Sequence, residues 1–223
     1  MKTQIVTIKS ISQTTHDVLC ITTEKPKELQ FKPGQATEVF INKPGWETKG
    51  RPFTFTCLPS DDDVEFIIKT YPDHSGVTNK LLKLQTGDEL ILNDIFGAIA
   101  YKGEGTFIAG GAGITPFISI LRDLKSKNKL EKNTLIFANK TSKDIILEDE
   151  LQDMLGNNFI NILSEEKTEQ YAHGFVTKEF LKKNAVSLNS HFYVCGPPPM
   201  MDAVNEQLSA LNVDSDKIIT EAF

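Results

Sequence analysis

TFIAGGAGITPF, at Thr106–Phe117, joins a short apolar run to a helical pattern through three closely spaced glycines. The pattern predicts a strand that turns tightly into a helix, because Gly111 and Gly113 permit backbone angles that other residues avoid. We expect Thr115 to cap the helix and Pro116 to occupy its first position, where no N–H group is needed. The free N–H groups at such a helix start attract phosphate. Alone, the stretch is equally consistent with an ordinary glycine-rich turn.

The composition of the 223-residue chain excludes several classes of protein. A net charge of −6, from 24 Lys and Arg against 30 Asp and Glu, argues against nucleic-acid binding, which depends on neutralising phosphates. No apolar run approaches the roughly 20 residues that span a bilayer. Cys20, Cys57 and Cys195 lie far apart without a Cys-x-x-Cys pair, which predicts a cytoplasmic setting with no disulfide, iron–sulfur cluster or metal. We also expect a monomer.

Short runs rich in β-branched and aromatic residues fill the first half of the chain and predict strands. The predicted strands are residues 3–9, 17–24, 36–41, 52–58, 64–70 and 89–93. Turn sequences such as Lys32-Pro33-Gly34-Gln35 separate them, and one helical pattern interrupts them at about 76–84. Closely spaced strands with such turns predict an antiparallel β-barrel or sandwich.

Strand-like and helical runs alternate after about residue 103. The predicted strands are 106–109, 134–138, 159–163, 191–195 and 217–220, and the predicted helices are 115–127, 147–155, 177–183 and 198–211. This alternation predicts a doubly wound α/β domain whose parallel sheet is covered on both faces. We therefore expect two domains, at residues 1–103 and 104–223.

Three loops of the second domain should meet at one edge of its sheet. Ligands of open parallel sheets bind beyond the carboxyl ends of the strands. Gly110–Thr115, Asn139–Asp144 and Cys195–Met200 each follow a predicted strand. We therefore expect these segments to line one crevice.

Two stretches of the first domain carry residue types that suit a nucleotide. Arg51-Pro52-Phe53-Thr54-Phe55-Thr56 places an arginine, whose planar fork fits phosphate, before aromatic and hydroxyl side chains. Read alone, an edge strand with a surface arginine is the simpler interpretation. His74-Ser75-Gly76-Val77-Thr78-Asn79 places a glycine and hydroxyl groups at a helix start, which is either a second anion site or only a capped helix.

Four motifs in this order and spacing resemble the ferredoxin–NAD(P) reductase family of flavoenzymes: RPFT, GVT, GGAGITP and CGPPPM. The resemblance covers essentially the whole chain. The final Glu221-Ala222-Phe223 is similar to the acid-x-aromatic end of the ferredoxin reductase branch, while FANKTSKDIILEDEL and CGPPPM resemble the NADH–cytochrome b5 reductase branch. The resemblance implies an oxidoreductase with an FAD-binding antiparallel β-barrel followed by an NAD(P)-binding α/β domain.

The resemblance implies a flavin site on the barrel. Arg51 would hold the flavin pyrophosphate, Phe53 would stack on the isoalloxazine ring and Thr54 would hydrogen-bond near flavin N5. The other residues implied at the flavin are Pro52, Lys69, Tyr71, Gly76, Val77 and Thr78. The family usually has Tyr where Phe53 stands, so stacking is kept but the hydroxyl is absent.

The resemblance also implies a nicotinamide site. Cys195 and Glu221 would flank the ring where hydride leaves C4 for flavin N5, and Phe223 would cover the flavin and swing aside. With Thr54, these are the expected catalytic residues. Those implied to receive the dinucleotide are Gly111, Gly113, Thr115, Pro116, Asn139, Asp144, Gly196, Pro197 and Met200.

The choice between NADH and NADPH is expected to be read just after the second strand of this domain. Asp144 would accept hydrogen bonds from free ribose hydroxyls and repel a 2′-phosphate, whereas Lys140 or Lys143 could hold that phosphate. The likeness to the cytochrome b5 reductase stretch favours NADH, and the two-domain layout favours FAD over FMN.

The electron acceptor is expected to be a separate one-electron carrier, with flavodoxin or ferredoxin first, because the chain lacks the cysteines of an appended cluster domain. Such acidic carriers would dock on Lys43, Lys49 and Lys80, although a net charge of −6 gives no long-range steering. Two alternatives stay open: a flavin reductase that releases reduced flavin, and a flavin- or nucleotide-binding subunit without turnover.

Overall fold

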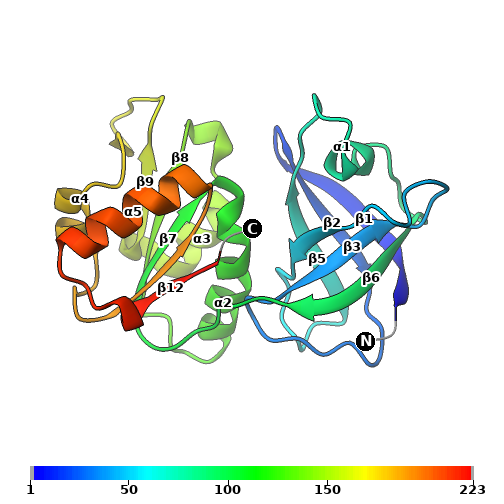
Figure 1. The fold of residues 1–223 in the computed structure, drawn as a ribbon, viewed down its shortest axis with the longest axis horizontal. Coiled ribbons are helices and arrows are strands. Elements are labelled where there is room, and N and C mark those ends of the chain that lie inside the picture. Colours follow the sequence, from blue (N-terminus) through cyan, green and yellow to red (C-terminus); the bar gives the residue numbers. More distant parts are fainter. Residues whose placement is uncertain (1–2, 222–223) are drawn as a thin grey trace.

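The computed structural model describes residues 3–221, which form two six-stranded sheets lying side by side (Figure 1). The first sheet has the order β4-β3-β6-β1-β2-β5, and its pairings are antiparallel. Its strands are β1 (Gln4–Thr15), β2 (Val18–Glu24), β3 (Ala36–Ile41), β4 (Arg51–Thr54), β5 (Asp63–Lys69) and β6 (Glu89–Phe96). A bridge between Phe55 and Phe66 joins the two ends of that order, so the sheet closes into the predicted barrel.

The chain turns a corner immediately after β4. The Phe55 N–H group donates to Gln35 O and the Thr56 N–H group donates to Glu65 O, each at 3.0 Å, so the chain passes from the side of β3 to the side of β5. Phe55 enters the barrel and stacks on Phe31, with ring centroids 4.1 Å apart. The predicted strand at 52–58 therefore ends early, because this corner replaces regular pairing.

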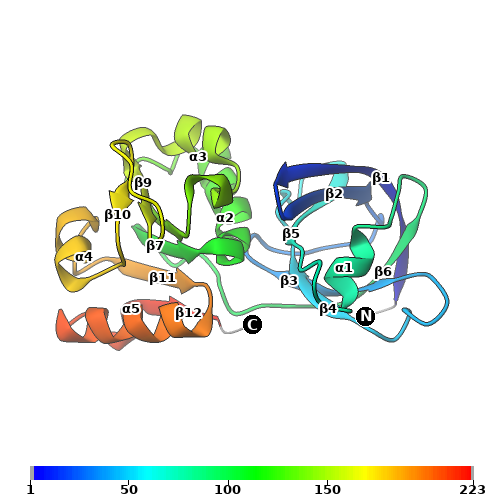
Figure 2. The same ribbon diagram turned by 90° about the horizontal axis from the view of Figure 1, so that it is seen from above.

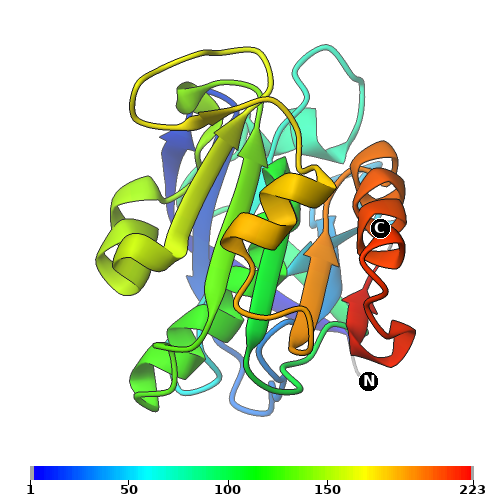
Figure 3. The ribbon, with the colours of Figure 1, turned by 90° about the vertical axis from the view of Figure 1, so that its left-hand side faces the viewer.

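The second sheet is parallel and has the order β10-β9-β8-β7-β11-β12. Its strands are β7 (Gly105–Gly110), β8 (Thr134–Asn139), β9 (Phe159–Leu163), β10 (Ala172–His173), β11 (His191–Cys195) and β12 (Ile218–Thr220). Figure 3 shows β9, β8, β7 and β11 running in one direction. The doubly wound domain is confirmed, and the two-residue β10 is an addition that the sequence pattern did not predict.

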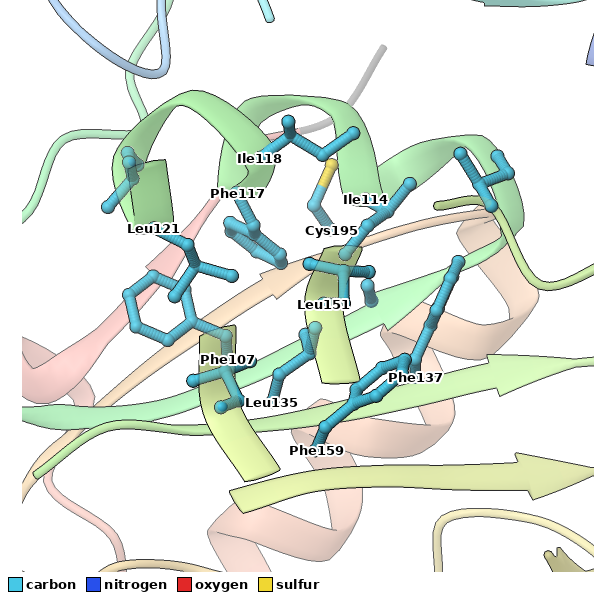
Figure 4. Close-up of a cluster of buried hydrophobic side chains, with 14 of the residues drawn as sticks. Phe107, Ile114, Phe117, Ile118, Leu121, Leu135, Phe137, Leu151, Phe159 and Cys195 are labelled. Atoms are coloured by element: carbon cyan, nitrogen blue, oxygen red, sulfur yellow. The ribbon is translucent and has the colours of Figure 1, made fainter. Parts of the chain in front are cut away.

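Helices cover both faces of this sheet. Successive side chains along each strand point to opposite faces, so each face carries apolar side chains that helices bury. Phe107 and Ala109 pack in one core with α2 (Thr115–Ser126) and α3 (Glu148–Leu155), whose side chains Figure 4 shows in close-up. Ile108, between them, packs in a second core with α4 (Lys178–Asn184) and α5 (Pro198–Ala210). In Figure 2, α2 and α3 lie on one side of the sheet and α5 lies on the other.

The start of α2 corrects one expectation. A 3-10 turn at Gly111–Ile114 leads directly into the helix, so Ile114 is the cap, Thr115 is the first helical residue and Pro116 is the second. The Thr115 hydroxyl donates to Ala112 O at 3.1 Å instead of accepting a hydrogen bond from a helix N–H group. The predictions of Thr115 as the cap and of Pro116 as the first helical residue were both wrong, because the 3-10 turn before α2 moves the start of the helix one residue earlier.

Helix α2 also packs against the barrel. The Gly34 N–H group donates to Ser119 Oγ at 2.9 Å, and Val18 and Ile67 of the barrel belong to the same apolar cluster as α2. Gly34 has φ +93, and a Cβ there would lie 2.5 Å from Ile99 O, so the contact needs glycine. The short helix α1 (Val77–Leu81) instead buries Val77 and Leu81 in the barrel core.

Two further points concern the whole chain. The last strand of the first sheet ends at Phe96, and the first strand of the second sheet begins at Gly105. The exact domain boundary near residue 103 stays a prediction. Within residues 3–221, none of the helices has the length and apolar character required to cross a membrane.

Replacing Phe107 by alanine should lower the free energy of unfolding by about 3–5 kcal/mol. Its buried ring lies 4.4 Å from the Tyr193 ring and 5.1 Å from the Phe117 ring, between centroids, so the change opens a cavity between sheet and helix. Urea unfolding followed by circular dichroism measures the loss. Phe175→Ala is the control, because Phe175 is 75% exposed and its loss should cost under about 0.5 kcal/mol. Equal costs for the two variants would contradict this view of the core.

Candidate functional site

One cavity of about 1290 Å³ lies between the barrel and the parallel-sheet domain. Both domains line it: β4 and α1 belong to its barrel wall, and the 3-10 turn after β7 belongs to the opposite wall. The carboxyl ends of β7 and β8 open onto it, as expected for a parallel sheet. A cavity of this size holds a large organic ligand.

The barrel wall gathers the residues that the sequence assigned to a flavin. The lining residues among them are Arg51, Pro52, Phe53, Thr54, Lys69, Tyr71, Gly76, Val77 and Thr78. The corner after β4 makes this possible, because it sends Phe55 into the barrel and leaves Phe53 and Thr54 facing the cavity. The structure thus brings these residues together, while their individual roles stay predictions.

The opposite wall gathers most of the residues that the sequence assigned to a dinucleotide. The lining residues among them are Gly111, Gly113, Thr115, Asn139, Asp144, Gly196, Pro197 and Met200. A Cβ on Gly113 would lie 2.3 Å from Cys195 O, so the loop after β7 packs tightly on the end of β11. Pro116 is buried in α2 and does not line the cavity.

Cys195 does not line the cavity either, although a place in the crevice was expected. Its side chain is fully buried, and in Figure 4 it points among Ile114 and Ile118. Burial raises the pKa of the Cys195 thiol to about 12, and the negative charge of Glu221 adds to the rise. The thiol is therefore protonated at neutral pH, and its catalytic role stays a prediction.

Glu221 follows β12 and reaches back to the segment that links the domains. Its Oε1 accepts a hydrogen bond from the Ala98 N–H group at 2.9 Å, while its buried Oε2 has no partner among the described residues. A buried carboxylate oxygen without a donor is costly, so a donor group of a ligand would stabilise this atom. Glu221 does not, however, line the cavity. Phe223 lies outside the described residues.

Asn139 presents a second unsatisfied group, at the end of β8. Its side chain is 8% exposed, and neither Oδ1 nor Nδ2 has a hydrogen-bond partner within residues 3–221. The residue nevertheless lines the cavity. Because an amide offers both donors and an acceptor, this side chain fits a ligand with mixed polar groups, such as a nucleoside.

The loop after β8 is held by acidic side chains. Asp144 Oδ2 accepts from the Thr141 N–H group and from the Thr141 hydroxyl, each at 2.8 Å. Glu166 accepts from the Ser142 N–H group at 2.6 Å, and its hydrogen bonds to Ser142 lower the pKa of the Glu166 carboxyl. Lys140 Nζ lies 3.0 Å from Glu165 Oε1.

The sequence interpretation missed part of the cavity wall. The missed lining residues include Ser164, Glu165, Gly174, Phe175, Val176, Ala203 and Val204. Phe175 follows β10, so the rule that ligands meet strand ends applies to it. The two-residue β10 carries too little periodicity to be found, but the Gly174-Phe175 pair next to it was an available signal.

Two family models match the chain. An FAD-binding domain model matches residues 3–137, and an oxidoreductase NAD-binding domain model matches residues 107–206. The chain is 30% identical to the reductase component of propane 2-monooxygenase from Mycolicibacterium goodii, over 97% of this chain and 66% of that protein. It is 30% identical to NADH-cytochrome b5 reductase 2-A from Vanderwaltozyma polyspora, over 88% of this chain and 72% of that protein. The chain thus spans about two thirds of the length of the monooxygenase component.

Solved structures share the fold. A ferredoxin NADP+ reductase from Neisseria gonorrhoeae with bound FAD and NADP superposes with a TM-score of 0.84 at 20% identity, covering 99% of this chain and 98% of that chain. The FAD/NAD binding domain of nitric oxide dioxygenase from Vibrio cholerae has a TM-score of 0.87 at 20% identity, with coverage of 99% and 98%. At these identities the likeness shows the two-domain architecture.

Stability should fall at alkaline pH because the cysteine thiols ionise at lower pH in the unfolded chain than in the folded one. Burial raises the pKa of Cys195 to about 12, and the pKa values of Cys20 and Cys57 to about 11, from an ordinary value near 9. A folded-state pKa above the unfolded value gives stability that is complete below about pH 9 and is lost as pH rises further. For Cys195 the loss is about 1 kcal/mol at pH 10.

Urea midpoints at pH 8 and pH 10 test this prediction. Cys195→Ala should fall less than the wild type between the two pH values, because its share of the loss is removed. Equal falls would mean that the Cys195 thiol is not buried as described.

Proposed function

Because this chain belongs to the ferredoxin–NAD(P) reductase family of flavoenzymes, we propose that it passes hydride from NADH to bound FAD and then single electrons to a separate carrier protein. The observation that carries the proposal is a cavity lined by Arg51–Thr54 on one side and by Gly111–Gly113 on the other. FAD, when bound, accepts two electrons as hydride and can release them one at a time. We place the FAD-binding domain at residues 1–103 and the NAD-binding domain at 104–223.

The barrel wall has the chemistry to hold FAD. The exposed Arg51 guanidinium would pair with the pyrophosphate through its planar fork. Phe53, half-buried beside the cavity, would stack on the isoalloxazine ring, and the Thr54 hydroxyl would bond near N5. The backbone N–H groups of Val77 and Thr78 at the start of α1 would complete the pyrophosphate contact.

The opposite wall has the chemistry to hold and orient NADH. Gly111 has φ +49 and open space where a Cβ would stand, so the turn lets a phosphate approach the backbone. The unpartnered amide of Asn139 would gain hydrogen bonds from the nucleoside. Glu221 Oε2 would stabilise the positive charge that develops on the nicotinamide as hydride leaves.

The acidic side chains around the loop after β8 support a preference for NADH. A 2′-phosphate needs free N–H groups and a free cation. Here the Ser142 N–H group donates to Glu166, Lys140 is paired with Glu165, and Lys143 does not line the cavity. Asp144 adds a further negative charge at the cavity wall. Free ribose hydroxyls, in contrast, would donate to these carboxylates.

For the acceptor we propose an acidic one-electron carrier, flavodoxin or ferredoxin first, with a cytoplasmic location and a monomeric reductase. Of the expected docking lysines, Lys49 and Lys80 lie with Nζ 4.7 Å and 5.8 Å from the Trp46 ring centroid. Lys43 is paired with Asp88 at 2.7 Å, which weakens its attraction for a partner. We therefore assign docking to Lys49, Lys80 and Trp46. The name of the propane 2-monooxygenase relative makes an oxygenase component a second candidate acceptor.

The purified protein should carry a yellow chromophore that bleaches when NADH is added without oxygen. Flavin released by heat should co-elute with FAD and not with FMN. Oxidised flavodoxin or ferredoxin added next should restore the flavin absorbance. A colourless protein that neither takes up FAD nor oxidises NADH would contradict the proposal, and saturable dependence on free flavin with no response to carriers would favour a flavin reductase.

Glu165→Gln and Glu166→Gln should each raise kcat/KM for NADPH about fivefold while kcat/KM for NADH changes little, because each change removes one negative charge that would repel a 2′-phosphate. The first change frees Lys140 and the second weakens the competitor for the Ser142 N–H group. Steady-state kinetics with both coenzymes measures the effect. Glu169→Gln is the control, because Glu169 is exposed on the same loop and does not line the cavity. No change in either variant would refute the electrostatic basis of the preference.

A further inference from the structure

Arg122, on α2, binds groups from both domains. Its Nε and Nη2 donate to the two carboxylate oxygens of Glu150 on α3, at 2.6 and 2.8 Å. Its Nη1 donates to Glu65 Oε1 on barrel strand β5 at 2.7 Å and to Thr56 O at 2.9 Å. The Thr56 hydroxyl also donates to Glu65 Oε1 at 2.7 Å. One guanidinium therefore ties two helices of the second domain to two segments of the first.

This contact is partly sealed from solvent. The side chains of Arg122 and Glu65 are 20% and 26% exposed. Burial disfavours the charged guanidinium, but Glu150 and Glu65 outweigh that effect and hold the pKa of Arg122 above its usual value. Buried ion pairs add little net stability because of their desolvation, but a bidentate arginine fixes geometry. The contact is thus better suited to orienting the domains than to stabilising the fold.

On the second domain, Arg122 is connected rigidly to the cavity. Residues four and three apart share a helix face, so Thr115, Ser119 and Arg122 line one side of α2. Thr115 lines the cavity, and Ser119 accepts from Gly34 of the barrel. At 1.5 Å per residue, Arg122 lies about 10 Å along the helix from Thr115. The helix therefore links the domain contact to the nucleotide wall.

On the barrel, the partners of Arg122 are equally close to the proposed flavin wall. Glu65 lies four residues before Lys69 on β5, and Thr56 lies two residues after Thr54. Lys69 and Thr54 both line the cavity. A shift at the Arg122 contact would therefore move one wall of the cavity relative to the other.

We propose that Arg122 is a positioning residue that sets how the NAD-binding domain docks on the barrel, and through it the separation of nicotinamide C4 from flavin N5. The inference rests on the proposed function, because only hydride transfer makes that separation matter. Reacting atoms must lie about 3–3.5 Å apart, and a displacement of about 1 Å can cost roughly 100-fold in rate.

Glu65→Gln is the sharpest variant, because it removes the charge on the barrel while Arg122 keeps its bidentate contact with Glu150. We expect full FAD occupancy and at least a 10-fold lower rate of flavin reduction at saturating NADH, measured by stopped flow. Arg122→Gln should show a larger loss, and Arg122→Lys should recover part of it through its point charge. Asp123→Asn is the control, since it breaks only the exposed pair with Lys127 on the same helix.

A second measurement uses the FAD-free protein. Calorimetry should show one unfolding transition for the wild type and Asp123→Asn, and two separated transitions for Glu65→Gln. Wild-type reduction rates in Glu65→Gln and Arg122→Gln, with only lower unfolding temperatures, would overturn the proposal. If the wild type itself is not reduced by NADH, the proposed function fails, whereas the calorimetry still reports whether Arg122 couples the domains.

Discussion

The structure depends on the packing of one helix, α2, against two partners at once. One side of α2 covers the parallel sheet, where Phe117 meets Phe107 in a buried core. Another side lies on the barrel, where Ser119 accepts from Gly34 and apolar contacts reach Val18 and Ile67. Because interiors are close-packed, neither contact can shift without disturbing the other. The cavity between the domains exists in its present shape because this helix holds both walls.

Some buried polar groups of the second domain lack hydrogen-bond partners among residues 3–221. Most buried polar groups in proteins are hydrogen-bonded, so Asn139 and Glu221 Oε2 are exceptions that need an explanation. Asn139 lines the cavity, whereas Glu221 follows β12 and does not line it. A site that binds and releases a coenzyme in every turnover cannot satisfy its own polar groups in advance. Under the proposed function, the free energy cost of leaving the Asn139 amide unpaired would be recovered when the coenzyme binds.

Local patterns predicted the architecture well and long-range contacts poorly. Alternation along strands and the strand–helix order gave both sheets, and the motif residues from Arg51 to Met200 largely meet in one cavity. The errors lie where distant segments decide the outcome. Thr115 is not the helix cap, because a 3-10 turn leads directly into α2. Cys195 is buried because α2 lies over the end of β11. The partners of Arg122 come from 57 and 28 residues away, which no periodicity encodes.

The two walls of the cavity differ in how rigidly they are built. The barrel wall must keep a flavin through many turnovers, and it is built from closed strands with Phe55 locked inside. The nucleotide wall is built from loops at strand ends, which tolerate opening. Apolar contact between the domains has little orientational preference, whereas a guanidinium shared by Glu65 and Glu150 accepts only a narrow range of angles. A polar contact at the seam is therefore what a distance-sensitive transfer requires, since it fixes the walls relative to each other without closing the cavity.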